Sequence, residues 1–256
     1  MSLSIADSGI RLAVLCIVMA LVATLVYRFT SLGSVRVVPG ALVRGALQLA
    51  AISLILAAAL AHIWSAILVL VGMFAAASFT AARRCGAGTS GAWLTIALAS
   101  GIGVVLPLML LSGVVPLEGV ALVPIGGIVL GGAMTATSMA AKRGLDAVDD
   151  RYGEVEAALS LGFSQRDARW EVARTAASDA LLPGVDQTRT VGLVTLPGAF
   201  VGVLLATGSA VQAGAVQILV LAGLLLAQTC SVAVALELVA RGFVFRGKTV
   251  RPARVR

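Results

Sequence analysis

Seven long apolar runs constrain this chain more than any other feature. They fall near residues 10–27, 41–61, 63–82, 92–112, 119–141, 190–208 and 214–240. Each run approaches the roughly 20 residues that a helix needs to cross the hydrocarbon core of a bilayer. Hydrophobic residues make up 59% of the chain and charged residues 12%, which no soluble domain requires. The sequence therefore predicts an all-α, polytopic membrane bundle of about seven helices, as one domain over residues 1–256.

The basic residues predict how these helices are oriented. Arginines and lysines follow the first, third, fifth and seventh runs, whereas the connections on the opposite side carry Glu118 and almost no basic residue. Because basic loops remain in the cytoplasm, the N-terminus is expected outside and the tail at 243–256 inside. The net charge of +7 then reflects topology rather than nucleic-acid binding. The first run lacks a cleavage site and is expected to stay as a span of a multi-pass plasma or inner membrane protein.

One long polar segment, 142–189, interrupts the apolar runs and holds nine of the twelve acidic residues. Apolar residues recur in it at three- and four-residue steps, which is typical of a helix. Gly162 suits a helix C-terminus, and Ser164 with Asp167 forms a capping box that opens a second helix. Pro183 and Gly184 are expected to end that helix. The segment is predicted to be a cytoplasmic helix–turn–helix elbow.

The letters Glu-Ala-Ala-x-x-x-Gly, residues 156–162, lie in the first half of this elbow. A short helix that ends in a tight turn can insert rigidly into a cleft of a soluble partner, because small residues allow close approach and glycine lets the chain reverse. An ordinary amphipathic helix with a glycine cap would carry the same letters. The residues predicted to dock on a partner are Glu156, Ala157, Ala158, Gly162, Phe163 and Ser164.

Polar residues inside the apolar runs are few, and such residues are candidates for a transport pathway. Gln217 and Gln228 lie in the last run, and Glu237 lies near its inner end, where it can pair with Arg241. Arg44 is close enough to the interface to reach water instead. The residues chosen as pathway candidates are Arg44, Gln48, Met134 and Gln217. Methionines offer soft metal ligands, but they are also common in spans, and the metal ligands remain unknown at this stage.

Glycines are spaced for close helix packing in two runs. Gly127 and Gly131 form a small-x-x-x-small face in the fifth run, as do Gly198 and Gly202 in the sixth. Such thin helices also permit sliding or bending. Pro197 is expected to break the sixth run near its start.

The sequence shows no enzyme motif. It has no Walker A, G-x-S-x-G or H-E-x-x-H pattern, a single histidine, and three cysteines without pair spacing. The chain is therefore expected to lack an ATPase site, to bind no cofactor, and to take its energy from elsewhere.

Five stretches together resemble the FetB-type permeases of the iron-export ABC transporter family, which also include plant aluminium-tolerance proteins. The stretches occur in the family's order and are residues 41–49, 124–136, 156–162, 192–198 and 216–220. The resemblance covers about residues 40–242. It implies a permease that pairs with a separate ATP-hydrolysing subunit, as two copies of each, and that exports iron or another metal.

Two departures from the family pattern concern the substrate. Gly132 stands where the family often has Asn, and residues 199–203 replace a frequent Met-Met-Thr-Gly-Gln. Polar and thioether groups that would suit a metal are therefore missing. Two alternatives stay open: an ABC permease for a different solute, and a membrane scaffold or assembly protein that transports nothing.

Overall fold

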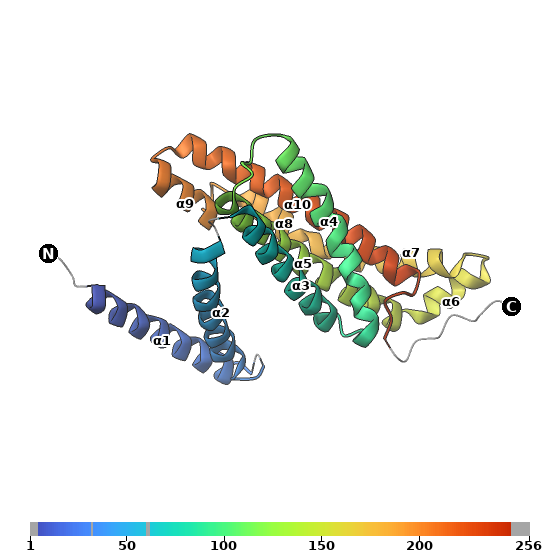
Figure 1. Cartoon of the computed structure of the whole chain (residues 1–256). Coiled ribbons are helices and arrows are strands. Elements are labelled where there is room, and N and C mark those ends of the chain that lie inside the picture. The colour runs from blue at the N-terminus through green and yellow to red at the C-terminus, as the bar shows by residue number, and fades with distance from the viewer. Residues whose placement is uncertain (1–4, 32, 60–61, 247–256) are drawn as a thin grey trace. The chain divides into compact units, whose positions relative to one another are not determined.

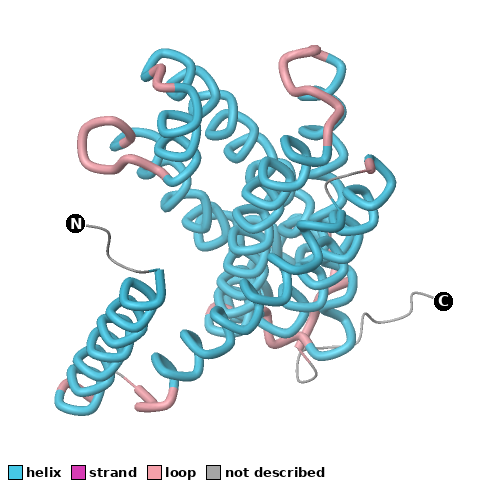
Figure 2. The backbone as a smooth tube through the Cα atoms, turned by 60° about the vertical axis from the view of Figure 1, so that its left-hand side comes forward, coloured by secondary structure: helices cyan, strands magenta, loops and turns pink. Residues whose placement is uncertain are grey.

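The computed structural model describes residues 5–31, 33–59 and 62–246, which belong to two compact units, Met1–Ala61 and His62–Arg256. Helices dominate both units (Figure 2). Within those residues, the only strand-like pairing is an isolated bridge between Val191 and Thr195. The prediction of an all-α chain is confirmed.

The first unit consists of α1 (Ile5–Phe29) and α2 (Val37–Ala59), which contact each other. Each contains an apolar window long enough to cross a membrane, Ile10–Phe29 and Val37–Leu54, and none of either window is buried. Leu and Ala form helices readily, and in a bilayer the lipid solvates the exposed apolar side chains.

The second unit is built around four long helices (Figure 1). These are α3 (Ile63–Arg84), α4 (Leu94–Leu111), α5 (Gly119–Asp150) and α10 (Ala210–Ala240), with a short 3-10 helix at Gly88–Trp93 before α4. Helix α5 contacts the other three, and α10 contacts α4 and α5. Small residues permit close approach: a Cβ atom on Gly101 of α4 would lie 2.5 Å from the carbonyl oxygen of Ala227 in α10.

Helices α5 and α10 run parallel. Arg246, just after α10, forms ion pairs with Asp146 and Asp149 near the end of α5. Residue numbers rise in the same direction along both helices, since Gly132 lies beside Leu224 and Gly144 lies beside Val239. The chain leaves α5 at one side of the bundle and begins α10 at the other. It must therefore cross the bundle again between Asp150 and Ala210.

That crossing is made of short pieces: α6 (Tyr152–Ser160), α7 (Gln165–Ser178), a 3-10 turn (Asp179–Leu181), α8 (Leu182–Thr190) and α9 (Gly198–Thr207). The predicted helix–turn–helix elbow corresponds to α6 and α7, and α7 packs along α5 and α10. Pro183 begins α8 instead of ending a helix, because a proline in the first turn removes an N–H group that has no helical partner.

The span predicted at 190–208 is wrong as a single long helix, whereas the break expected at Pro197 is present. Only α9, ten residues long, is helical in that run after Thr190, and it reaches only about 15 Å. The helix breaks because the Thr190 carbonyl accepts from three N–H groups of the following turn, Gly192 adopts φ +81°, and Pro197 has no N–H to donate. Six helices in the described residues are long and apolar enough to span a membrane, and the short pieces between Asp150 and Ala210 return the chain across the bundle.

Residues 247–256 of the predicted basic tail lie outside the described residues. The orientation of the chain in the membrane remains a prediction.

Candidate functional site

The elbow between α6 and α7 is a closed turn. The N–H of Phe163 donates to the Ala158 carbonyl (3.1 Å), and that of Gly162 donates to the Leu159 carbonyl (3.0 Å). This pair of bonds with Gly162 at φ +90° defines a Schellman turn, which only glycine enters without strain. The turn fixes the direction in which the next helix leaves.

Ser164 then caps α7, as predicted. Its hydroxyl oxygen accepts from the Asp167 N–H (3.1 Å), and the hydroxyl donates to the Asp167 carboxylate (2.6 Å). The hydrogen bond from Ser164, with a second from Arg166, lowers the pKa of Asp167. The carboxylate is therefore ionised at neutral pH, beside the positive end of the α7 dipole.

The elbow also has its own small core. Val155 of α6 and Ala168 and Val172 of α7 are buried against one another. Outside this core the tip is exposed, with Leu161 80% and Phe163 49% accessible. A rigid, glycine-turned tip with two exposed apolar side chains is a geometry that fits a pocket on a partner protein.

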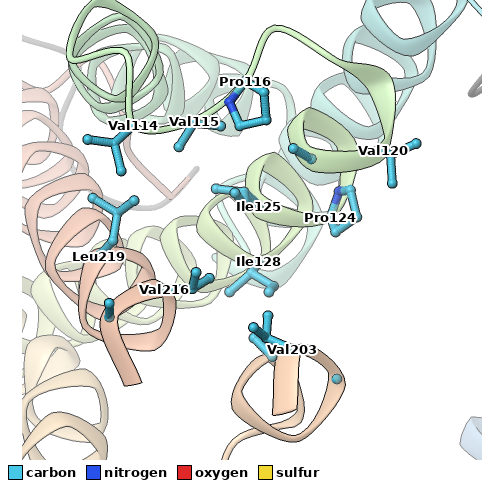
Figure 3. A pocket seen from close by; sticks show the side chains of 14 residues that line it. Val114, Val115, Pro116, Val120, Pro124, Ile125, Ile128, Val203, Val216 and Leu219 are labelled. Atoms are coloured by element: carbon cyan, nitrogen blue, oxygen red, sulfur yellow. The ribbon is translucent and has the colours of Figure 1, made fainter. Parts of the chain in front are cut away.

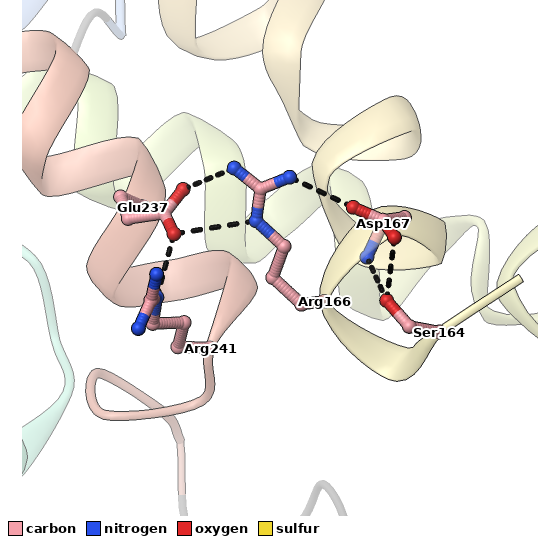
Figure 4. A network of polar contacts seen from close by, with 5 residues as sticks. All are labelled: Ser164, Arg166, Asp167, Glu237 and Arg241. Atoms are coloured by element: carbon pink, nitrogen blue, oxygen red, sulfur yellow. Dashed lines mark hydrogen bonds and ion pairs between the residues drawn. The ribbon is translucent and has the colours of Figure 1, made fainter.

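A network of ion pairs ties this elbow to α10 (Figure 4). The Arg166 guanidinium donates to both carboxylate oxygens of Glu237 (2.6 and 3.2 Å) and to Asp167 (2.7 Å). Arg241 donates to the same Glu237 (2.6 Å). The hydrogen bond to Glu237, followed by that to Asp167, raises the pKa of Arg166, so the guanidinium keeps its charge. The start of α7 and the inner end of α10 are thus held together.

Five of the six predicted docking residues lie exposed on this elbow. They are Glu156, Ala157, Gly162, Phe163 and Ser164, while Ala158 is half-buried and contacts the elbow's core. Leu161 and Arg166 were not among the residues predicted for this site. Leu161 could have been found because it directly precedes the motif glycine. Nothing in the local sequence indicates the pairing of Arg166 with Glu237.

The four pathway candidates are divided between the two units. Arg44 and Gln48 are exposed on α2, in the first unit. Met134 packs against the core of the second unit. Gln217 is buried, and its amide oxygen accepts from the Phe200 N–H of α9 (3.1 Å), so its side chain holds α9 against α10.

Of the four glycines predicted to allow close helix packing, only Gly127 has a close neighbour in the described structure. A Cβ atom on Gly127 would lie 2.9 Å from Met73 of α3, whereas one on Gly131, Gly198 or Gly202 would meet nothing within 4 Å. Pro197 directly precedes α9 as its N-cap residue.

The described residues of the second unit enclose several cavities, and the two larger ones that lie against α5 bear on a solute site. The outer one, about 430 Å³, is lined by apolar side chains at the start of α5, in the loop before it, on α9 and on α10 (Figure 3). Ile125, Val203 and Leu219 point into it. The second, about 370 Å³, lies between α5, α8 and α10 and contains Gln187 and Gln228. Across the described residues there is no cluster of three or more His, Cys, Asp or Glu side chains suited to a metal ion.

The uncharacterised protein family UPF0014 matches residues 10–244 of the chain. The UPF0014 membrane protein STAR2 of Oryza sativa is 31% identical over 75% of this chain and 68% of its own length. Protein ALUMINUM SENSITIVE 3 of Arabidopsis thaliana is 31% identical over 60% of this chain and 57% of its own. The probable iron export permease protein FetB of Escherichia coli is 33% identical over 58% of this chain and 57% of its own. No solved structure matches the chain.

Proposed function

The chain belongs to the UPF0014 family, and we propose that it is the membrane-spanning permease subunit of an ABC transporter. It is a multi-pass membrane protein, and one of its relatives is named a probable iron export permease protein. The observation that carries the proposal is the elbow: a Schellman turn at Gly162, an exposed tip at Leu161 and Phe163, and a bonded connection to a long span.

In this proposal a separate cytoplasmic ATPase subunit receives the elbow tip in a cleft. ATP binds to that subunit, and its movement displaces α6 and α7 as one body because they share a core. The two bonds between Arg166 and Glu237 pass the displacement to α10. Packed helices respond to such a shift by moving between discrete arrangements.

A second copy of the chain completes the permease. Helix α8 carries Asp186 and Arg189, whose side chains are 65% and 74% accessible. Gly184 of the same helix lies against Gln228 of α10, far from either end of that span. Charged side chains at such depth face water or protein, not lipid. We therefore place α8 beside a water-filled path between two copies.

The substrate we propose is iron or another metal, exported with energy from the ATPase subunit. A permease for a different solute is the second candidate, because the polar groups noted in the family are missing at Gly132 and 199–203. ATPase activity of the reconstituted complex, measured against Fe²⁺, Mn²⁺ and Al³⁺, separates the two. Stimulation by a metal supports export of that metal, and a flat response to all three counts against it.

Purification in mild detergent tests the permease assignment itself. We expect a nucleotide-binding subunit to accompany the wild-type chain from its native membranes and to be lost with Gly162→Ala. Gly113→Ala is the matched control, because Gly113 also has a positive φ and free space around its Cβ position, at the end of α4. A wild-type chain that comes down alone would favour the scaffold alternative.

A further inference from the structure

The cavity between α5, α8 and α10 differs from the outer one in its lining. Its volume is about 370 Å³, and polar side chains reach it from all three helices. They are Thr135 of α5, Gln187 of α8 and Gln228 of α10. Thr135 and Gln187 are exposed and Gln228 is buried, so the cavity opens to the surface and ends at Gln228. Three polar groups that line one space in a membrane bundle are the arrangement expected of a solute site.

Gln228 is the central group. It is 6% exposed, and its amide oxygen has no hydrogen-bond partner among the described residues. Buried polar atoms almost always have a partner, so this acceptor requires an explanation. A ligand that donates a hydrogen bond would supply one.

Two glycines leave the room in which this amide lies. A Cβ atom on Gly184 would be 2.1 Å from the Gln228 amide oxygen, and one on Gly132 would be 3.1 Å from the amide nitrogen. The first distance is far below contact, and the second is tight. The side chain therefore fits only because both neighbouring helices have glycine at this level.

The depth of the cavity follows from α10. Gln228 precedes Glu237, which pairs with two arginines at the inner end of the helix. Glu237 follows Gln228 by nine positions, which correspond to about 14 Å of helix, close to half the thickness of a hydrocarbon core. Gln228 lies near mid-depth, where an orphan acceptor is not satisfied by interfacial water.

We propose that this cavity binds the transported solute, and that the solute is a hydrogen-bond donor: the water-bearing shell of a metal cation or the hydroxyl groups of a small polyol. The Gln228 amide oxygen accepts from it, with Gln187 and Thr135 beside it. Thr135 gives its hydroxyl proton to the Gly131 carbonyl (3.0 Å), which leaves its oxygen to accept. That the bound solute is the transported one rests on the proposed function; binding at Gln228 does not.

Thermal unfolding of the full chain in lipid nanodiscs tests the site with three probes: MnCl₂, glucose and sodium phosphate. Mn²⁺ or glucose is expected to raise the unfolding temperature as it saturates, and phosphate is not. A response to Mn²⁺ identifies a hydrated cation, and one to glucose identifies a hydroxyl-bearing solute. No response to either, or a response to phosphate alone, overturns the proposal.

Gln228→Leu keeps the volume of the side chain and removes the acceptor, so the apparent Kd should rise about tenfold, as for the loss of one strong hydrogen bond. Gly184→Ala should give the same loss by occupying the space beside the amide. Gly214→Ala is the control. Gly214 lies in α10, as Gln228 does, and has nothing within 4 Å of its Cβ position, so this variant should bind normally. Unchanged binding in both cavity variants would overturn the assignment.

The two proposals fail separately. If no ATPase subunit accompanies the chain but binding depends on Gln228, the permease assignment fails and the site stands. If the subunit accompanies wild type and Gln228→Leu alike while binding ignores Gln228, the site alone fails.

Discussion

The elbow and the mid-depth cavity are built on opposite principles. At the elbow, the turn closes its own backbone bonds, the cap is internal, and each of Arg166, Asp167 and Glu237 has a partner of opposite charge. In the cavity, the Gln228 oxygen has none among the described residues. A part that satisfies itself can act as a rigid handle, whereas a part that is left incomplete can bind something. We read the first as the docking element and the second as the solute site.

The largest expected effect comes from cutting the connection between these two regions. Glu237→Leu leaves Arg166 and Arg241 without their shared carboxylate, at the junction through which the elbow moves α10. We expect ATP-driven transport in proteoliposomes to fall at least about tenfold, a barrier change of roughly 1.4 kcal/mol. The ATPase subunit should still co-purify, because the tip is intact.

Transport at the wild-type rate in Glu237→Leu would show that the network is only structural. Glu171→Ala is a matched control, since Glu171 pairs with Arg174 on the exposed face of α7 and does not reach α10.

The second effect concerns the packing around the cavity, measured as the stability of the second unit. A Cβ atom on Gly132 would lie 2.2 Å from a methyl group of Leu224. Gly132→Ala should therefore destabilise the second unit by about 1–3 kcal/mol, the range for overpacking. Gly131→Ala, one position earlier with open space, should be neutral or slightly stabilising. Unfolding in denaturant would compare them, and equal stabilities would contradict the close packing.

A smaller effect is expected at the elbow. Ser164→Ala removes the N-cap oxygen that accepts from the Asp167 N–H, which costs about 1 kcal/mol in other helices. Hydrogen exchange should show faster exchange at the start of α7 and no change in α10. Loss of protection throughout the bundle would mean that the elbow is not an independent element.

The pH dependence of the elbow is expected to be the smallest effect. Because the folded-state pKa of Asp167 is lowered, its contribution is fully present above the ordinary aspartate pKa of about 3.9 and is lost as pH falls through the lower folded value. Protection of α7 should stay level from pH 8 to 5 and decline only in stronger acid. A decline centred near pH 6 would contradict this assignment.

The elbow was largely predictable from sequence because its determinants are local. Gly162, Ser164 and Asp167 lie within six positions and specify a turn and a cap by themselves. The break at Pro197 was predicted, but the turn that precedes it was not, since residues 190–208 are as apolar as a continuous span. Its form depends on Gly192, on the Thr190 carbonyl and on the amide of Gln217 in another helix.

The cavity at Gln228 could not be predicted from the sequence either, because it depends on how separate helices pack. Gln228 was visible as a polar residue in an apolar run, but its significance depends on Gly184 and Gly132, which approach it from other helices. Gln217 looked equivalent in sequence and proved to bond α9. Only the packing distinguishes a glutamine with a partner from one without.

Photo-crosslinking in native membranes tests whether the elbow tip docks on an ATPase subunit, with benzoylphenylalanine placed at Leu161 or at Leu193. Both leucines are highly exposed, 80% on the elbow tip and 89% on the broken crossing. If the elbow tip docks as proposed, position 161 forms an adduct with a nucleotide-binding subunit and position 193 does not. No adduct with such a subunit from position 161, or the same adduct from both positions, would contradict it.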